Sequence, residues 1–504
     1  MASSPAPLWQ PCLDISSLAA LYRNGTSPVQ IAETVLERIR VYHDRDPAVW
    51  IYRVPEASVL SAARILPTHF PNKDSLPPLY GVPFSLKDNI DVAGIPTTTA
   101  CPPFTRSPHE SSTVFEELVR QGALFIGKTN MDQLASGLTG CRSPYGIPRS
   151  VYSEEYITGG SSSGSAVSVG ADLVSFSIGT DTAGSVRVPA AFNGVVGLKP
   201  TKGLISASGV TPACASLDCV GILARNLDDA IRVWHSCMET LHDEKDVHSK
   251  QGFRGSAHPS RPAEDFLFVI PPSSLLEACS PAYRQMFDLA VDILQAIGGK
   301  QSLSPSISIN WDDIQEAGRL LYGGAFLSER IADLPDGFLE TQLEHFHPVT
   351  RQVFEEALAR NDTAIQAFRD LHAQATLIRN VGPFFKWHGD AEDEIAIIVT
   401  PTTPSHFTIS DVLADPIRMG SILGTYTQFA NVLDLPAVSV PAGTYNILEG
   451  SGNHQSRPLP FSITLTAGCC NDAGLLNLAK RFEDAISLRD GGPGQSRRRD
   501  LDRC

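Results

Sequence analysis

The sequence lacks several features that would assign the chain to a membrane or to nucleic acid. No apolar run approaches the ~20 residues that a membrane span needs, and residues 1–13 contain prolines but no apolar core of a signal peptide. Lys and Arg number 40 against 55 Asp and Glu, which gives a formal net charge of −15. Because nucleic acids and anionic membranes are bound by clustered Lys and Arg, this charge argues against both. We therefore expect a cytoplasmic protein that acts on a small molecule.

Metal-binding and phosphate-binding patterns are also missing. The ten cysteines show no Cys-x-x-Cys spacing and no accompanying His-x-x-x-His pair, so we expect no metal site. Cysteines scattered in this way are typical of unpaired thiols in a reducing compartment. No Gly-x-x-x-x-Gly-Lys-[Ser/Thr] sequence occurs, which excludes the usual phosphate-binding loop. The sequence implies neither a metal nor an organic cofactor.

The sequence contains enough apolar residues to form a large hydrophobic core. The 504 residues are 42% hydrophobic and 19% charged, and no linker divides them. We therefore expect one domain over residues 13–487, with its central part at about 80–225. Residues 1–12 and the Gly-, Pro- and Arg-rich residues 488–504 are expected to be disordered, and the polar residues 241–262 to form a mobile surface loop.

Predicted helices and strands alternate along the chain, which indicates an α/β fold. Ser27, Pro28 and Gln30 predict the start of a helix that ends near His43. Further helices are expected at 112–121, from 281 to 298 and at 472–486. Strands are expected at 48–54, 80–86, 123–126, 174–178, 266–270, 395–399, 437–441 and 461–466.

The stretch Gly159 to Pro189 is the strongest candidate for a catalytic centre. Apolar residues alternate from 174 to 178, and the following Gly-Thr-Asp-Thr-Ala-Gly turn delivers Ser185 to the start of a helix. A serine placed there can attack a carbonyl while the N–H groups of Thr182, Ala183, Gly184 and Ser185 hold the developing oxyanion. The alternative is a Gly- and Ser-rich loop that only turns the chain.

Lys87 makes a purely structural loop less plausible. It ends the apolar segment Tyr80 to Asn89, which reads Tyr-Gly-Val-Pro-Phe-Ser-Leu-Lys-Asp-Asn. A lysine acts as a base only when neutral, so its pKa must fall by roughly 3 from about 10.4, and burial causes such a fall. No histidine lies in either segment, so a Ser-Lys arrangement is simpler here than a Ser-His-Asp triad.

These two segments resemble the amidase signature family, whose catalytic unit is a serine, a second serine in a cis peptide, and a lysine. The spacing between the two serines of that family matches Ser161 and Ser185. The resemblance therefore implies Ser185 as nucleophile, Ser161 as the bridging serine and Lys87 as base. It also implies the fold, a large mixed β-sheet covered by helices on both faces. Asp181 and Arg187 are expected to brace the turn rather than to react.

Other segments resemble the allophanate hydrolase branch of that family. These are Asp46 to Ile51, Lys87 to Thr98, Gly127 to Gly146, Ser161 to Ser163 and Gly424 to Asp434. That branch binds its carboxylated urea with a tyrosine and an arginine, and the match places Tyr322 and Arg330 in those roles. Arg330 can fork a carboxylate. The alternative is that Arg330 pairs with Glu329 or Asp333 on its own helix.

The resemblance thus implies hydrolysis of the C–N bond of allophanate with release of ammonia. Two departures leave the substrate open: Gly324, Ala325 and Phe326 stand where Gly-Pro-Trp is expected, and the chain ends soon after the amidase core, without the further carboxyl-terminal domain that allophanate hydrolases commonly carry. Alternatives are an amidase of the same mechanism with another small urea-like or secondary-metabolite substrate, and a component of an amidotransferase complex. A homodimer is expected from family habit.

Overall fold

One mixed sheet organises the chain. The structure is a computed structural model that describes residues 10–238, 242–250, 265–302, 308–386, 395–446 and 458–489. Within these residues, 11 strands form a single sheet in the order β1-β3-β2-β4-β6-β5-β10-β11-β9-β7-β8. The strands are β1 (Trp50–Arg53), β2 (Pro83–Lys87), β3 (Leu124–Thr129), β4 (Phe176–Asp181), β5 (Val196–Lys199), β6 (Cys219–Ala224), β7 (Phe266–Val269), β8 (Gly299–Gln301), β9 (Ile395–Pro401), β10 (Ala437–Tyr445) and β11 (Leu459–Ala467).

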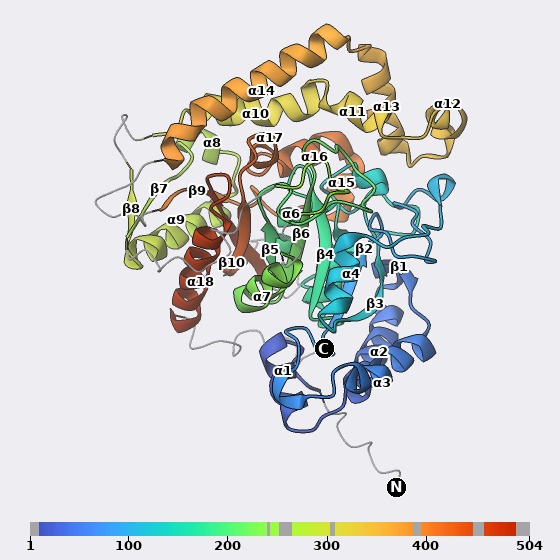
Figure 1. The fold of residues 1–504 in the computed structure, drawn as a ribbon. Coiled ribbons are helices and arrows are strands. Elements are labelled where there is room, and N and C mark those ends of the chain that lie inside the picture. The colour runs from blue at the N-terminus through green and yellow to red at the C-terminus, as the bar shows by residue number, and fades with distance from the viewer. Residues whose placement is uncertain are drawn as a thin grey trace, which may run out of the picture.

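Helices connect these strands and form one separate group. The helices before β7 are α1 (Ile15–Arg23), α2 (Pro28–Arg45), α3 (Glu56–His69), α4 (Thr113–Arg120), α5 (Ser163–Gly170), α6 (Arg187–Phe192) and α7 (Leu227–Cys237). Those after β7 are α8 (Ser273–Leu276), α9 (Pro281–Ala296), α10 (Trp311–Gly323), α11 (Phe326–Ala332), α12 (Phe338–Gln342), α13 (Pro348–Arg360), α14 (Ala364–Phe385), α15 (Ile409–Ala414), α16 (Pro416–Leu423), α17 (Phe429–Val432) and α18 (Asp472–Arg489). Helices α10 to α14 gather at the top of the molecule (Figure 1).

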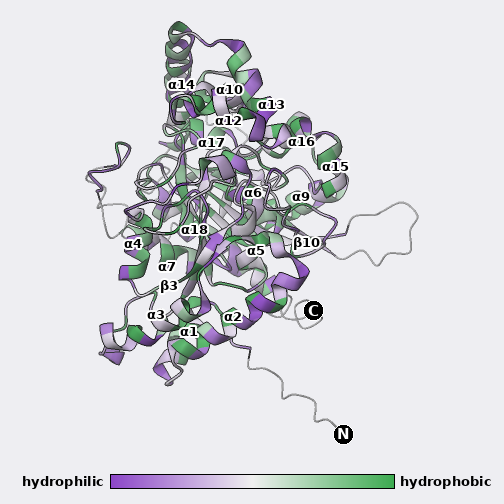
Figure 2. Ribbon diagram, turned by 90° about the vertical axis from the view of Figure 1, so that its right-hand side faces the viewer, coloured by the Kyte–Doolittle hydropathy of each residue, from purple (hydrophilic) through white to green (hydrophobic). Residues whose placement is uncertain are grey.

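Helices cover both faces of the sheet, as expected. In β9, Ile395, Ile397 and Val399 belong to one apolar cluster, whereas Ala396 and Ile398 belong to another on the opposite face. The first cluster includes residues of α2, α7, α9 and α18, and the second includes residues of α10, α14 and α17. Because successive side chains of a strand point to opposite faces, this alternation shows a sheet buried between two layers. In Figure 2 the layer of α10, α13 and α14 again projects at one end.

The centre of the sheet carries the candidate catalytic segments. β2 lies between β3 and β4 and is parallel to both, so their carboxyl ends meet at one edge. Every residue of β2 and of β4 is buried. In an open sheet of this kind, the edge at the carboxyl ends of parallel strands is where ligands bind.

Most predicted elements appear within a few residues of their expected ends. The capping box at Ser27 and Gln30 is confirmed, although α2 continues to Arg45. The expected strands at 48–54 and 80–86 begin later, at Trp50 and Pro83, and the strand expected at 174–178 is shifted to Phe176–Asp181.

Two segments that were expected to be disordered or mobile form hydrogen bonds where the structure describes them. Gln10 and Pro11 accept hydrogen bonds from Arg38 at 3.0 and 2.7 Å, so the end of the expected lead is fixed to α2. In the polar stretch, Asp243 accepts from Ser206 at 2.6 Å and Asp246 accepts from the N–H of Ala207 at 2.9 Å. Residues 242–250 are therefore pinned to the surface. Residues 1–9, 241, 251–262 and 490–504 lie outside the described residues.

Candidate active site

Lys87 lies at the carboxyl end of β2 and is fully buried. Its Nζ is 2.8 Å from Oγ of Ser161 and 2.7 Å from Oγ1 of Thr180. Burial lowers the pKa of Lys87 to about 7, and the carboxylates of Asp218, Asp132 and Asp181 only partly oppose this effect. Among the described residues, no carboxylate lies within ion-pair distance of Lys87. The structure thus places a lysine that can be neutral near pH 7 beside a serine hydroxyl.

Ser161 is held where three backbone segments meet. The Gly160–Ser161 peptide is cis, the carbonyl of Ser161 accepts the N–H of Asp132 at 3.1 Å, and the N–H of Gly160 donates to Leu138 at 2.8 Å. A Cβ added at Gly160 would lie 2.1 Å from Oδ2 of Asp132. Only glycine fits at this close approach, which explains the glycine before the bridging serine.

Ser185 lies in the tight turn between β4 and α6 and is 2% exposed. The N–H of Ser162 donates to the carbonyl of Ser185 at 3.1 Å. The turn is therefore tied directly to the residue that follows Ser161. The structure brings the segments of all three predicted catalytic residues together at the carboxyl ends of β2 and β4.

Asp181 and Arg187 brace this turn, as predicted. Arg187 donates to the Asp181 carboxylate through Nε at 3.0 Å and Nη2 at 2.8 Å, and both side chains are fully buried. Arg187 and the other hydrogen-bond donors lower the pKa of Asp181 to about 2 against the opposing effect of burial. Asn431 of α17 completes the brace, since it accepts from Arg187 at 3.0 Å and donates to the carbonyl of Asp181 at 2.6 Å.

The predicted oxyanion site needs one correction. The N–H of Gly184 donates to Oδ1 of Asp181 at 2.9 Å, so it is not available to an oxyanion. Within the described residues, the N–H groups of Thr182, Ala183 and Ser185 have no acceptor. The brace thus takes one donor of the turn and leaves the other three for a ligand.

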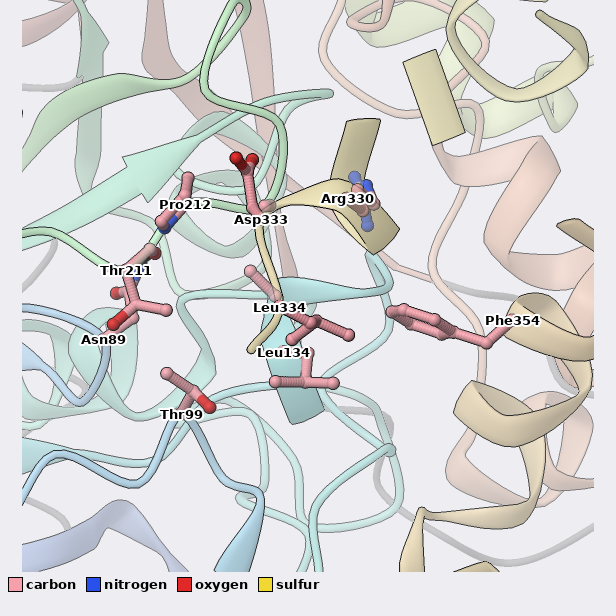
Figure 3. A pocket seen from close by; sticks show the side chains of 11 residues that line it. Asn89, Thr99, Leu134, Thr211, Pro212, Arg330, Asp333, Leu334 and Phe354 are labelled. Atoms are coloured by element: carbon pink, nitrogen blue, oxygen red, sulfur yellow. Dashed lines mark hydrogen bonds between the residues drawn. The ribbon is translucent and has the colours of Figure 1, made fainter. Parts of the chain in front are cut away.

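Arg330 of α11 and Phe354 of α13 line a cavity together with residues of the segments that connect strands and helices (Figure 3). The residues that line it are Asn89, Thr99, Leu134, Ala135, Thr211, Pro212, Ala213, Arg330, Asp333, Leu334 and Phe354. Asn89 connects the cavity to Lys87, since its Nδ2 lies 3.3 Å from Oγ1 of Thr180, which Nζ of Lys87 contacts at 2.7 Å. The cavity is thus one side chain away from the Lys87 and Thr180 pair.

Arg330 is buried, with 5% of its surface exposed, but it lacks a partner in the described part of the chain. Its Nη1 is among the buried polar atoms without a hydrogen bond. Glu329 instead accepts from Ser216, through the N–H at 2.7 Å and Oγ at 2.6 Å. Among the described residues, neither Glu329 nor Asp333 forms an ion pair or hydrogen bond with Arg330, so the alternative that Arg330 pairs with one of these acids is wrong. Buried Asp218 attracts Arg330 without a direct contact. A buried guanidinium without a hydrogen-bonded acid is still costly, and a ligand anion would stabilise it.

Tyr322 is not brought into this cavity. Its ring packs against the apolar cluster beneath α10, and its carbonyl accepts from Nη1 of Arg360 at 2.7 Å. The predicted role of Tyr322 in substrate binding stays a prediction.

The sequence analysis missed the backbone that shapes the cavity. Thr99 and Leu134 both have φ of 53°, in the left-handed region that residues other than glycine rarely adopt. They are joined, since the N–H of Leu134 donates to the carbonyl of Thr99 at 2.8 Å. Such conformations concentrate at ligand sites. The sequence does not predict these left-handed conformations, because neither position is a glycine.

The profile of the family described as Amidase matches residues 30–476 of the chain. The chain belongs to the amidase family. The enzyme is therefore an amidohydrolase with the fold of the amidase signature enzymes. Allophanate hydrolase from Kluyveromyces lactis superposes with a TM-score of 0.80 at 34% identity, over 96% of this chain and 73% of that one.

The curated relatives differ in how much of their own length they share with this amidase. Urea amidolyase from Lachancea kluyveri is 37% identical over 87% of this chain, but the match covers 22% of the relative, and the share is the same for the urea amidolyase of Saccharomyces cerevisiae. The chain thus spans about a fifth of these relatives. A glutamyl-tRNA(Gln) amidotransferase subunit from Symbiobacterium thermophilum is 32% identical over 95% of this chain and 98% of its own length.

The described residues contain neither a membrane span nor a metal-binding cluster. No described helix is both long and apolar enough to cross a bilayer. In the same ranges, no three His, Cys, Asp or Glu side chains are grouped so that they could hold a metal ion.

Proposed function

We propose that the chain hydrolyses allophanate, a urea that carries a carboxylate on one nitrogen, with release of ammonia. The observation that carries this proposal is Arg330, a buried guanidinium without an acid partner, in a cavity beside the Lys87 and Thr180 pair. A carboxylate there would form two charge-assisted hydrogen bonds, each contributing roughly 1.5–3 kcal/mol. The likeness to a urea amidolyase and to an allophanate hydrolase supports the same substrate.

The proposed reaction begins with attack by Ser185 on the carbonyl that bears the terminal NH2 group. Neutral Lys87 takes a proton from Ser161, which takes the proton of Ser185. The N–H groups of Thr182, Ala183 and Ser185 hold the oxyanion. The tetrahedral intermediate then collapses, and the same relay returns the proton to the departing nitrogen, which leaves as ammonia.

The resulting acyl-enzyme on Ser185 is released by water. The relay takes a proton from the water as it attacks the ester carbonyl, and the bond between the acyl carbon and Oγ of Ser185 breaks. The product is an amine nitrogen that carries two carboxylates. One allophanate and one water thus give one ammonia and this dicarboxylated amine.

The test is ammonia release by the purified protein from allophanate, with Ser185→Ala as the control. Turnover that disappears in Ser185→Ala supports the proposal. Inactivity on allophanate, together with Ser185-dependent hydrolysis of a neutral aliphatic amide, would replace it by an amidase of the same mechanism with another small substrate.

A second candidate is a component of an amidotransferase complex, which is favoured by the match to the glutamyl-tRNA(Gln) amidotransferase protein over 98% of that protein's length. Such a component would pass ammonia to a partner that binds a charged RNA. The net charge of −15 weighs against direct contact with RNA. Stable co-purification with a second protein from its own host, and ammonia release only in its presence, would favour this candidate.

A further inference from the structure

Asn89 has one amide atom that the protein does not use. Its side chain is 1% exposed, and Nδ2 donates to Oγ1 of Thr180 at 3.3 Å and to the carbonyl of Thr211 at 3.0 Å. The Thr211 carbonyl can only accept, so it fixes Nδ2 on that side of the amide. Oδ1 therefore lies on the other side, where it is buried without a hydrogen-bond donor.

An unsatisfied buried carbonyl is unfavourable by about 1–3 kcal/mol, so its position calls for an explanation. Asn89 lines the same cavity as Arg330, whose Nη1 is the other buried polar atom of that cavity without a partner. In Figure 3, Asn89 and Thr211 lie together on the side of the cavity away from Phe354. Beside Asp333 and the hydroxyls of Thr99 and Thr211, the cavity thus has one cationic donor and one neutral acceptor that lack a hydrogen-bond partner.

We propose that Oδ1 of Asn89 accepts an N–H of the substrate and so selects amides and ureides over esters. This inference rests on the proposed function for the identity of the substrate. A ligand that fits both groups carries a carboxylate for Arg330 and an N–H donor for Asn89. A carboxylated urea has both, and so does the shorter amide malonamate.

Asn89 also lies close to Lys87, the base of the proposed mechanism, because both side chains contact Thr180. Nδ2 of Asn89 and Nζ of Lys87 contact the same Oγ1 of Thr180, at 3.3 and 2.7 Å. When Oδ1 holds a substrate N–H, the reacting amide lies close to the group that receives the proton. Asn89 thus acts as a specificity-determining residue.

The test compares an amide with its matched ester. Malonamate and monomethyl malonate share the carboxylate and the reacting carbonyl, but the ester has no N–H. In Asn89→Leu, kcat/KM for malonamate is expected to fall by about 10- to 100-fold, whereas that for the ester changes by less than about threefold. Asn380→Leu, at an exposed position of α14, is the matched control and leaves both values unchanged.

A merely structural role for Asn89 predicts a different result. If Asn89 only positions Thr180 and Lys87, amide and ester turnover fall together, and this result overturns the proposal, as does an unchanged kcat/KM for both. The same comparison with propionamide and methyl propionate separates the two hypotheses: activity on this neutral pair alone contradicts allophanate as substrate but still tests Asn89.

A second variant guards against misfolding of Asn89→Leu. Asn89→Asp keeps the acceptor, so it is expected to retain the preference for the amide. Its carboxylate lies close to Lys87 and favours the protonated amine, so the pH profile of kcat/KM moves to higher pH than in the wild type. Loss of the amide preference in Asn89→Asp, without a change in the pH profile, would contradict the proposal.

Discussion

At the scale of single residues, burial determines the chemistry of Lys87. Burial is the main cause that lowers its pKa to about 7; Arg330 acts in the same direction, and the carboxylates of Asp218, Asp132 and Asp181 oppose it. The side-chain atoms in contact with its Nζ are the hydroxyls of Ser161 and Thr180 rather than carboxylates. An ion pair would have kept the lysine protonated. The sheet that buries Lys87 therefore allows it to be neutral near pH 7, as the base of the proposed mechanism must be.

The pH dependence of activity follows from this environment. Because only neutral Lys87 accepts a proton, kcat/KM should rise with pH, reach half of its maximum near pH 7 and level off above that value. Malonamide is the substrate of choice, since it does not titrate in this range. A profile that is flat from about pH 5.5 to 9 would contradict the role of Lys87. Lys87→Met should lower kcat by at least about 100-fold.

A second prediction concerns the contribution of Asp181 to the stability of the protein. Asp181→Asn removes the charge that neutralises fully buried Arg187 and should lower the free energy of unfolding by about 3–5 kcal/mol. Urea denaturation measures this loss. Glu316→Gln, which breaks the exposed Arg319 pair on α10, is the control and should cost less than about 1 kcal/mol. Equal losses in the two variants would show that the brace does not stabilise the turn.

At the scale of elements, a turn after one strand and a loop before one helix meet over the centre of the sheet. The N–H of Ser162 donates to the carbonyl of Ser185, and two residues earlier Gly160 closely approaches Asp132. Any side chain at residue 160 must move either Asp132 or the Ser161 segment. The geometry of the relay is thus a property of two packed segments rather than of one motif.

Gly160→Ala tests that packing. Its Cβ would lie 2.1 Å from Oδ2 of Asp132, so the variant should lose activity on all amides and melt at a lower temperature. Gly318→Ala, within α10, is the matched control. Its Cβ would lie 3.5 Å from the Gln428 side chain, an ordinary contact, so it should gain about 0.5–1 kcal/mol from helix propensity. A Gly160→Ala variant with wild-type activity and melting temperature would contradict this account.

The sequence predicted the elements that carry strong local signals. Apolar segments predicted strands β7, β9 and β11, and capping residues predicted helices α2 and α9. Strands β5, β6 and β8 were not predicted, since β5 and β8 have only four and three residues and β6 is a continuous apolar run without alternation. Helix α12 was not predicted because it buries only Leu339.

The candidate site could also be predicted only in part from the sequence. Lys87, Ser161 and Ser185 are implied by the resemblance to the amidase signature family. Asn89 is not, although it stands two residues after Lys87, because its role depends on Thr180 and Thr211 from distant segments. The Gly184 donor was assigned wrongly because the Asp181 brace that uses it exists only in three dimensions.

At the scale of the whole molecule, the helical group α10 to α14 contributes the arginine of the cavity, which the sheet does not provide. The sheet provides the base and the serines, whereas α11 provides Arg330 over the cavity. In Figure 1 this group lies above the carboxyl-end region of the sheet. In the proposed function, catalysis and recognition of the carboxylate thus come from different layers, so the substrate preference could change while the catalytic centre stays intact.

The central claim, that Arg330 selects a carboxylated substrate, is tested most directly by the ratio of kcat/KM for allophanate to that for biuret. Biuret replaces the carboxylate by a neutral amide of nearly the same shape. In Arg330→Met the ratio should fall at least about 10- to 100-fold, while biuret turnover is retained. Arg319→Met, at an exposed position of α10, should leave the ratio unchanged. A ratio that is the same in Arg330→Met and in the wild type would contradict the account.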